Sequence, residues 1–524
     1  MSTHKSIVKS ASIIGFATFC SRLLGFIRDV VIARLFGVYV YAQAFVIAFR
    51  IPNLFRDLVG EGATNAALVP VFSEYTVKHT KEEFWELANV VLNLLLVILA
   101  IITLLGVIFS PLIVRLIAPG FIADPFKLET TIRLNRIIFP YILLISLTAY
   151  AMGVLNSLKH FVVPAFAPCL LNVSIIIFAL LFGEGIKGLA LGVLVGGVLQ
   201  LAVQVPVLYR KGFKLHLFHK FRHPAAATIG KLMLPRLFSS GIYQLNNFVD
   251  SIFGSLSFIV GEGGVAVLYF AYRLIQFPLG IFSNALSQAI LPTFSTQALE
   301  ENKDNLRRTL SFGLRLEFFL MLPASMGFII LAHPIITGLF SGGRFDAYSA
   351  DMTAKALLFY SIGLVAYGAT KILQCCFFAL KDTVTPTKIA ALALVINVVL
   401  NVILMFPMKL AGLALATSIS GINTCLVLFF LLVRKIGSFD SKELGFSFLR
   451  ILLATLAMGA VCFFAAQHKF FAADNTVYRL LELGILLVIG VASYVIFCFI
   501  FHVKEIHELR NWLFKRQSKV VFNG

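Results

Sequence analysis

Fourteen apolar runs, each long enough to cross a lipid bilayer as a helix, follow one another through this chain of 524 residues. A helical span needs about 20 mostly apolar residues. The runs lie near residues 11–34, 39–60, 88–117, 132–157, 162–183, 187–209, 229–259, 264–292, 310–340, 352–380, 385–406, 410–434, 447–466 and 478–502. Charged residues make up only 13% of the chain, whereas soluble domains carry about 25%. The sequence therefore predicts an all-α polytopic membrane protein with fourteen transmembrane helices.

The basic residues behind the net charge of +19 lie mainly in short links between apolar runs and in the C-terminal tail. Lys5 and Lys9 precede the first run, and the even-numbered links hold most of the other lysines and arginines. Positive charge marks the cytoplasmic side of a membrane protein, so both termini are expected in the cytoplasm. The basic link 210–231 and the tail 504–519 are expected to contact anionic membrane lipids. This distribution argues against nucleic-acid binding.

The chain repeats itself after about 222 residues. Residues 188–197 read GLALGVLVGG and residues 412–421 read GLALATSISG, and the PVFS of 70–73 returns as PTFS at 292–295. Six spans are thus followed by six similar ones, and because six is even, both copies have the same orientation in the membrane. The predicted parts are an N-lobe (1–222), a C-lobe (223–440), and a C-terminal part (441–524) with two further spans and a cytoplasmic tail.

Charged residues interrupt the apolar runs at the start of each repeat. They are Arg22, Arg28, Asp29, Arg50, Arg56, Glu61 and Arg273. A charge at the bilayer centre costs roughly 2.5–3.5 kcal/mol, so such residues usually face a wet cavity in the protein. Guanidinium groups bind phosphate and carboxylate through paired hydrogen bonds. We predict that arginines from both halves meet at an anionic substrate; the alternative is that they reach out to lipid headgroups.

Polar residues in three further spans form a second candidate site. They are Asp250, Asn397, Asn401 and Thr417. Asn397 and Asn401 are four residues apart and therefore share a helix face. Oxygen ligands of this kind suit a hard cation such as Na⁺; the alternative is hydrogen bonding between helices.

Motifs of enzymatic chemistry are absent from the sequence. It contains no G-x-S-x-G, H-E-x-x-H or P-loop motif, and its ten histidines and seven cysteines lack the spacing of metal ligands. We therefore expect a transporter rather than an enzyme, with no cofactor beyond Na⁺ as a coupling ion.

Four segments resemble one known family. They are SRLLGFIRDVVIARLFG (21–37), AFRIPNLFRDLVGEGATNAALVPVFSEY (48–75), AYRLIQFPLGIFSNALSQAILPTFS (271–295) and LKDTVTPT (380–387). These segments, together with the number of spans, resemble the MurJ (MviN) lipid II flippases of the MOP exporter superfamily, and the similarity extends over essentially the whole chain.

The resemblance implies two six-helix lobes arranged as a V, with two C-terminal helices that form a groove for a lipid tail. It implies alternating access that moves the lipid-linked peptidoglycan precursor, lipid II, from the inner to the outer leaflet of the bacterial cytoplasmic membrane. We expect the protein to act as a monomer. The arginines of the cavity would bind the pyrophosphate of lipid II. Two departures make the cavity less acidic: Gln43 and Tyr272 stand where many members have an acid. Asn401 stands where an aspartate can occur, which would weaken a cation site.

Other functions remain open from the sequence. A flippase for another polyprenyl-diphosphate glycan would need the same arginines. A cation-coupled multidrug exporter of the same superfamily would bind cations and should offer acidic groups instead. A membrane glycosyltransferase or ligase would need catalytic carboxylates and a large external loop, and the sequence has neither.

Overall fold

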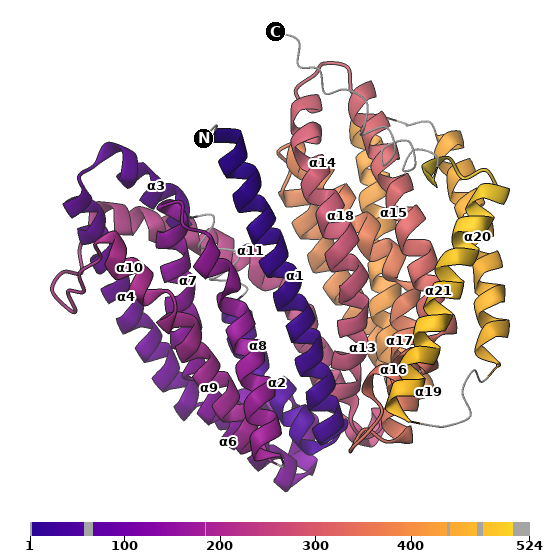
Figure 1. The fold of residues 1–524 in the computed structure, drawn as a ribbon, viewed down its shortest axis with the longest axis horizontal. Coiled ribbons are helices and arrows are strands. Elements are labelled where there is room, and N and C mark those ends of the chain that lie inside the picture. The colour runs from indigo at the N-terminus through magenta and orange to yellow at the C-terminus, as the bar shows by residue number, and fades with distance from the viewer. Residues whose placement is uncertain (1–2, 57–66, 184, 438–440, 469–474, 507–524) are drawn as a thin grey trace. The chain divides into compact units, whose positions relative to one another are not determined.

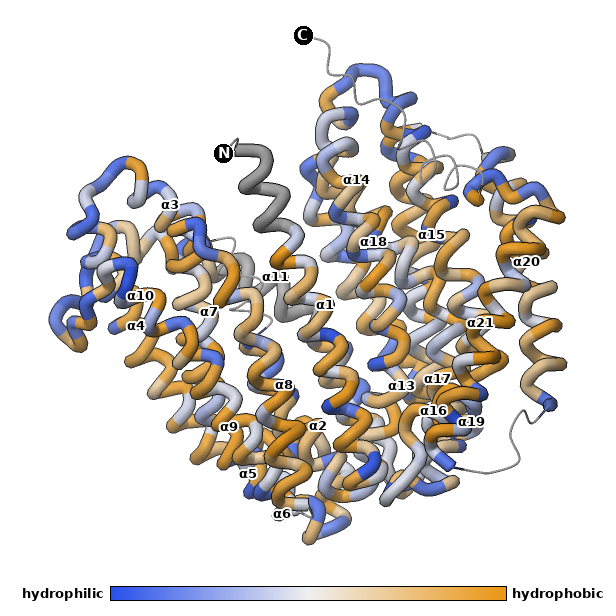
Figure 2. Tube along the Cα trace, in the orientation of Figure 1, coloured by the Kyte–Doolittle hydropathy of each residue, from blue (hydrophilic) through white to orange (hydrophobic). Residues whose placement is uncertain are grey.

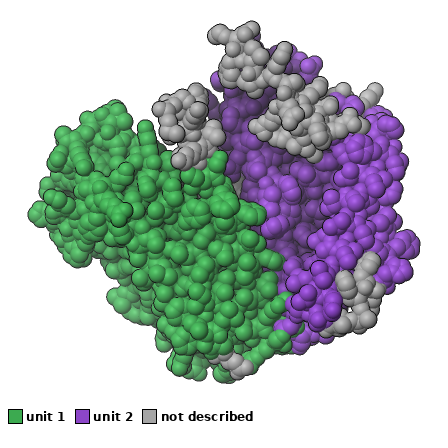
Figure 3. All heavy atoms as spheres, in the orientation of Figure 1, with its two compact units in different colours: residues 1–266, 343–345 green, residues 267–342, 346–524 purple. Residues whose placement is uncertain are grey.

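A computed structural model describes residues 3–56, 67–183, 185–437, 441–468 and 475–506. Regular structure in these ranges is helical, with the elements labelled in Figure 1. The chain divides into two compact units, which Figure 3 colours separately: unit 1 comprises residues 1–266 and 343–345, and unit 2 comprises residues 267–342 and 346–524.

Unit 1 is built from the first helices of the chain and ends within α13. Its elements are α1 (Thr3–Phe36), α2 (Val40–Phe55), α3 (Val69–Lys78), α4 (Lys81–Ile108), α5 (Ser110–Ile117), η2 (Pro119–Ala123), α6 (Pro125–Ile138), α7 (Tyr141–Ser157), α8 (Val162–Phe182), α9 (Ile186–Ala202), α10 (Val205–Lys211), α11 (Pro224–Gly254) and α12 (Ser257–Val260). Helix α8 packs between α1 and α9, α2 packs on α6, and α4 packs on α7.

Unit 2 contains most of α13 and all later helices. Its elements are α13 (Gly264–Pro278), the π-helical turn η3 (Leu279–Ser283), α14 (Asn284–Gln297), α15 (Asp304–Ile330), α16 (Ala332–Phe340), α17 (Ala347–Ile362), α18 (Leu364–Ala379), α19 (Val384–Ile436), α20 (Ser441–Ala466) and α21 (Thr476–Ile500). Helix α15 packs against α17, α18 and α20, and α20 packs on α21.

Among the described residues, nine helical segments are long and apolar enough to cross a membrane, and the bent pair α17–α18 adds a tenth. Only 22% of the most apolar window is buried in α4, and the same fraction in α19. Figure 2 shows hydrophobic colour along most of the long helices and hydrophilic colour mainly at their ends and turns. Exposed apolar surface of this extent is stable in lipid and not in water. The prediction of a helical, polytopic membrane protein is confirmed.

The 53-residue helix α19 holds two of the predicted spans. Its backbone is non-helical at Lys409, with φ 52° and ψ −131°. This break lies between the predicted spans 385–406 and 410–434. A left-handed φ is unfavourable for a residue with a side chain, so the surrounding packing must hold the turn.

Small residues allow α8 and α9 to approach closely. A Cβ added to Gly192 would lie 2.7 Å from the Cα of Ile175, and one added to Gly196 would lie 2.8 Å from Leu171 Cδ1. Ser174 Oγ also donates a 2.8 Å hydrogen bond to the carbonyl of Gly192. The glycines spaced four apart in the sequence therefore form the packing stripe that such spacing predicts in membrane helices.

The division between the units differs from the predicted lobe boundary at 222/223. Helix α11 follows that boundary, yet it belongs to unit 1. Ala225 and Ile229 at its start join a buried cluster that includes Trp85 and Phe213. Packing thus places α11 with the first unit, whereas the sequence repeat assigns it to the second lobe. The repeat-based boundary stays a prediction.

Candidate functional site

Arg28 is the most deeply buried arginine of the predicted cavity set. It lies on α1 in unit 1 and is 3% exposed, and its neighbour Asp29 is 0% exposed. Arg28 Nε and Nη2 donate hydrogen bonds of 3.0 and 2.7 Å to Asp29 Oδ1. Arg28 Nη1 donates a 3.0 Å bond to Oδ1 of Asn172 on α8. The carboxylate and the amide together fix the plane of the guanidinium.

Asn172 connects this pair to the backbone of α1. Its Nδ2 donates a 3.1 Å hydrogen bond to the carbonyl of Ser21, about two helical turns before Arg28. The contact between α1 and α8 is therefore polar as well as apolar at the level of Arg28 and Asn172. A lone amide in a hydrophobic run is usually read as helix packing, and nothing in the sequence indicated that it would orient an arginine.

Aromatic rings border the arginine. The guanidinium carbon of Arg28 lies 5.9 Å from the ring centroid of Phe49 on α2, within the range of a cation–π contact. Phe49 stacks on Tyr141 at 5.9 Å, and Tyr141 Oη donates a 3.2 Å hydrogen bond to Gln200 Oε1. Tyr141 also lies within electrostatic range of Arg56 and Arg28. Tyr141 on α7 is thus influenced by two cations, Arg28 on α1 and Arg56 at the end of α2.

The other predicted residues of unit 1 have different surroundings. Arg22 is exposed on α1, and Arg50 is half-buried on α2. Arg50 lies within electrostatic range of Asp250 on α11. Glu61 lies outside the described residues.

Arg273, the predicted contribution of the second repeat, lies on α13 in unit 2. It is half-buried, and its Nη1 donates a 3.4 Å hydrogen bond to Gln276 Oε1, one turn along the same helix. Within unit 1, Arg28 is paired with Asp29, Arg28 and Arg56 lie within electrostatic range of Tyr141, and Arg50 lies within electrostatic range of Asp250; Arg273 belongs to unit 2.

Three of the four predicted cation ligands form one hydrogen-bonded chain in unit 2. Asn401 Nδ2 donates to Asn397 Oδ1 at 3.1 Å, and Asn397 Nδ2 donates to Thr417 Oγ1 at 3.2 Å. This chain joins the two halves of α19 across the break at Lys409. The buried Oδ1 of Asn401 accepts no hydrogen bond within the described residues. The fourth residue, Asp250, lies in unit 1.

A second group of intramembrane charges, which sequence reasoning missed, lies in unit 2. Glu317 on α15 is 0% exposed, and its Oε1 accepts a hydrogen bond from Ser283 Oγ in the π-helical turn. Lys371 on α18 is half-buried, donates to Asn284 Oδ1, and lies within electrostatic range of Glu317. π-Helical turns are rare and often occur at functional sites. The signal was present in the sequence as charges within the runs 310–340 and 352–380.

A buried lysine was also missed in unit 1. Lys127 at the start of α6 is 1% exposed, and its Nζ lies 2.7 Å from Glu262 Oε1. Gln43 Nε2 donates a 3.1 Å hydrogen bond to the same oxygen. Glu262 therefore supplies a carboxylate to both Gln43 and Lys127.

No group of three or more His, Cys, Asp or Glu side chains with metal-binding geometry occurs in the part of the chain that the structure describes. The long apolar helices bury arginine, lysine and carboxylate side chains, and membrane helices retain such charges along transport paths. The protein is therefore a polytopic membrane transport protein.

Known proteins share this fold. A structure described as lipid II flippase MurJ in an inward closed conformation matches with a TM-score of 0.78 at 29% identity, covering 94% of this chain and 99% of that one. An inward-facing MATE family transporter of the MOP superfamily matches with a TM-score of 0.65 at 18% identity, covering 79% of this chain and 94% of that one, which shows a common fold.

Comparison with proteins of similar sequence shows the family to which this chain belongs. A probable lipid II flippase MurJ from Buchnera aphidicola is 35% identical over 463 residues, or 87% of this chain and 90% of the relative. One from Vibrio cholerae is 32% identical over 506 residues, or 94% and 96%. The family described as lipid II flippase MurJ matches residues 32–510. This chain belongs to the MurJ family, as its signature segments predicted, and it is a multi-pass transport protein of the bacterial inner membrane rather than an enzyme.

Proposed function

We propose that this chain moves lipid II, the lipid-linked precursor of peptidoglycan, from the inner to the outer leaflet of the bacterial inner membrane. Relatives that cover most of the chain are described as lipid II flippases. The observation that carries the chemistry is Arg28, a guanidinium buried among apolar helices and fixed by Asp29 and Asn172.

The proposed ligand of the arginines is the pyrophosphate of lipid II. A diphosphate offers several acceptor oxygens and several negative charges, which suit the paired donors of guanidinium. The proposed contacts come from Arg22, Arg28, Arg50 and Arg56 in the first lobe and Arg273 in the second, with Asp29 and Glu61 as partners of the arginines. Arg28 is supported most strongly, because two fixed acceptors already hold its plane and reduce the ordering cost of binding.

We propose that the fourteen predicted spans form two parallel six-helix repeats arranged as a V, with two C-terminal helices, and that the lobes alternate access as a monomer with both termini cytoplasmic. The break in α19 supports the count, since it turns one long helix into two spans. Helices α20 and α21 pack on each other and contact the rest of unit 2 mainly through α15 and α16. This peripheral position suits a groove for the lipid tail.

The coupling is proposed to use Na⁺ or the membrane potential. Asn401 Oδ1 is a buried oxygen with no hydrogen-bond donor in the described residues, as a cation ligand would be. Arg50 near Asp250 works against cation binding at that carboxylate. An empty cationic cavity returning toward a negative cytoplasm would gain about 2.3 kcal/mol per charge per 100 mV. Flipping that ignores both Na⁺ and an imposed potential would contradict this coupling.

Depletion in the native cell tests the proposed substrate. We expect lipid II to accumulate in the inner leaflet, measured by its accessibility to a label added to spheroplasts. Accumulation of a different polyprenyl-diphosphate glycan would indicate the alternative flippase. Unchanged lipid II together with sensitivity to cationic drugs would indicate a multidrug exporter, an outcome that the buried Arg28 disfavours.

A further inference from the structure

The polar link between α10 and α11 is fastened to α4 by two asparagines. Asn89 Nδ2 donates a 2.9 Å hydrogen bond to the carbonyl of Lys214, and Asn89 Oδ1 accepts one of 2.8 Å from the amide of His216. One turn along α4, Asn93 Nδ2 donates to the carbonyl of His216 at 3.1 Å, and Asn93 Oδ1 accepts from the amide of Phe218 at 3.2 Å. The link is therefore held at a defined distance from the helix.

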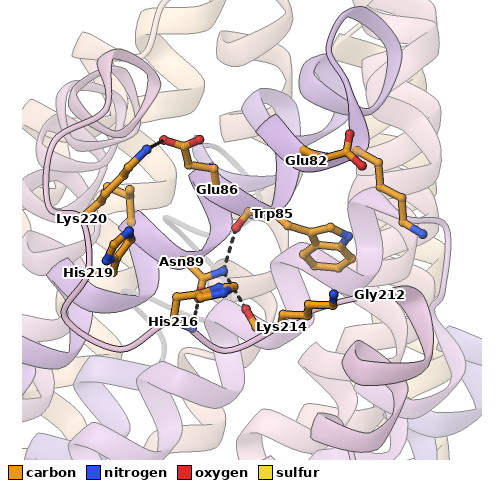
Figure 4. A pocket seen from close by; sticks show the side chains of 11 residues that line it. Glu82, Trp85, Glu86, Asn89, Gly212, Lys214, His216, His219 and Lys220 are labelled. Carbon is orange, nitrogen blue, oxygen red and sulfur yellow. Dashed lines mark hydrogen bonds and ion pairs between the residues drawn. The ribbon is translucent and has the colours of Figure 1, made fainter.

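A cavity of about 510 Å³ lies between this link and the first turns of α4, entirely within unit 1 (Figure 4). Its lining includes Lys81, Trp85, Glu86, Lys214, His216 and Lys220. Lys220 Nζ is paired with Glu86 Oε1 at 2.6 Å. Glu82 is the second carboxylate of the lining, so three lysines stand against two carboxylates, one of which is already paired.

One buried hydrogen-bond donor in this cavity, Trp85 Nε1, lacks an acceptor in the described structure, and the exposed Lys81 ammonium lies close to it. Trp85 is 8% exposed, and its buried Nε1 donates to nothing there. A Cβ added to Gly212 would lie 3.0 Å from Lys81 Nζ and 3.4 Å from Trp85 Nε1, so these donors flank the same spot, which glycine leaves open. An indole N–H and an ammonium group can only donate. Their shared requirement is an acceptor, and an anionic oxygen satisfies both.

The outer side of the link is apolar. Leu215, Leu217, Phe218 and Phe221 are 43%, 50%, 61% and 40% exposed, and they alternate with lysine and histidine along the chain. Phe218 has a left-handed φ of 56° and is held there through its amide by Asn93. Exposed leucine and phenylalanine beside lysine are typical of segments that lie in the membrane interface. An anion that reaches this cavity is therefore expected to come from the lipid surface.

We propose that this cavity binds the phosphate headgroup of an anionic phospholipid. The phosphate oxygens accept from Trp85 Nε1 and Lys81 Nζ, Lys214 adds positive charge, and the apolar side chains of the link lie among the acyl chains. The site is separate from the arginines proposed to bind lipid II, so it assigns this chain a resident lipid in addition to its cargo. Its occupancy fixes the link to the membrane surface.

Trp85 itself can report on the site, because the chain has only two tryptophans. Replacing the other one, Trp512→Phe, leaves Trp85 as the single emitter. The full-length protein in phosphatidylcholine nanodiscs is titrated with dioctanoyl phosphatidylglycerol, with dioctanoyl phosphatidylcholine, and with inorganic phosphate. We expect saturable fluorescence change with phosphatidylglycerol alone. Removing two charges with Lys81→Gln/Lys214→Gln should weaken it roughly tenfold, as expected for charged hydrogen bonds.

Lys187→Gln is the matched control, because it removes an exposed lysine elsewhere in unit 1 and should leave the titration unchanged. Native mass spectrometry adds a readout for Trp85→Phe, which keeps an aromatic ring and removes the donor; we expect it to retain less phosphatidylglycerol at an unchanged melting temperature. Equal titration of the native and double-variant proteins would overturn the proposal. An equal response to inorganic phosphate would overturn the lipid source. Neither outcome bears on lipid II flipping, which is measured separately.

Discussion

Replacing Arg28 and Asp29 together by apolar residues separates a structural role of this pair from a role in substrate binding. Both side chains are buried, and two hydrogen bonds join them. Arg28→Ala alone leaves the Asp29 carboxylate without its guanidinium, and breaking a buried pair from one side costs about 3–5 kcal/mol. The double variant Arg28→Met/Asp29→Leu removes both charges, and such exchanges are often neutral for folding.

We expect Arg28→Ala to lower the melting temperature of the purified protein and the double variant to restore it. Neither should flip lipid II at the native rate. Each charged hydrogen bond to the diphosphate contributes about 1.5–3 kcal/mol, so losing one slows transport or weakens binding about 10- to 100-fold.

The assay is the protection of fluorescent lipid II from an impermeant quencher in proteoliposomes. Arg133→Ala is the control, since Arg133 is exposed on α6 and should flip normally. A double variant that is stable and also flips at the native rate would refute the reasoning, because Arg28 would then be a purely structural residue.

Three further predictions concern packing and pH. Gly192→Ala places a Cβ 2.7 Å from the Cα of Ile175, and such overpacking costs about 1–3 kcal/mol. Calorimetry should therefore show a lower melting temperature. The control Gly230→Ala has open space around the added Cβ and should leave the melting temperature unchanged. Gly368→Ala places a Cβ in collision with Glu317 Oε1 and should destabilise unit 2; the second change Glu317→Ala should recover the loss, and no recovery would show that the carboxylate is not the obstacle. Partial burial alone would raise the pKa of Asp382, but hydrogen bonds from Lys435 and Thr385 lower it to about 2. The contribution of Asp382 to stability is therefore complete above its unfolded-state pKa of 3.8 and is lost as pH falls toward 2. Acid unfolding of the Asp382→Asn variant should show a weaker pH dependence in this window. Identical unfolding curves for the native and variant proteins would contradict the assignment.

The long apolar runs and the family signature could be predicted from the sequence because both are local. Hydropathy over a window of about 20 residues needs no knowledge of neighbours, and the stripe of Gly188, Gly192 and Gly196 predicts close packing by its spacing alone. The charged candidates Arg28 and Asp29 were found for the same reason, since a charge in an apolar run is unusual wherever it points.

Partners distant in sequence could not be predicted. Asn172 lies 144 residues after the arginine that it holds, and only the packing of α1 on α8 brings them together. Glu317 and Lys371 were overlooked because the runs that hold them are long and mostly apolar despite these charges, and their significance comes from the fold of unit 2. The cavity beside Trp85 depends on Asn89 and Asn93, two residues that hydropathy counts as minor interruptions of a span.

The sequence by itself determined that this protein is helical and lies in a lipid bilayer, since both follow from which side chains lipid tolerates along a helix. Its signature segments determined the family. Tertiary structure alone decided which charged and polar groups meet: Arg28 with Asn172, Lys127 with Glu262, Asn397 with Thr417. The physical reason is that a buried polar group is stable only with a partner, and the choice of partner is made by helix packing rather than by position in the chain.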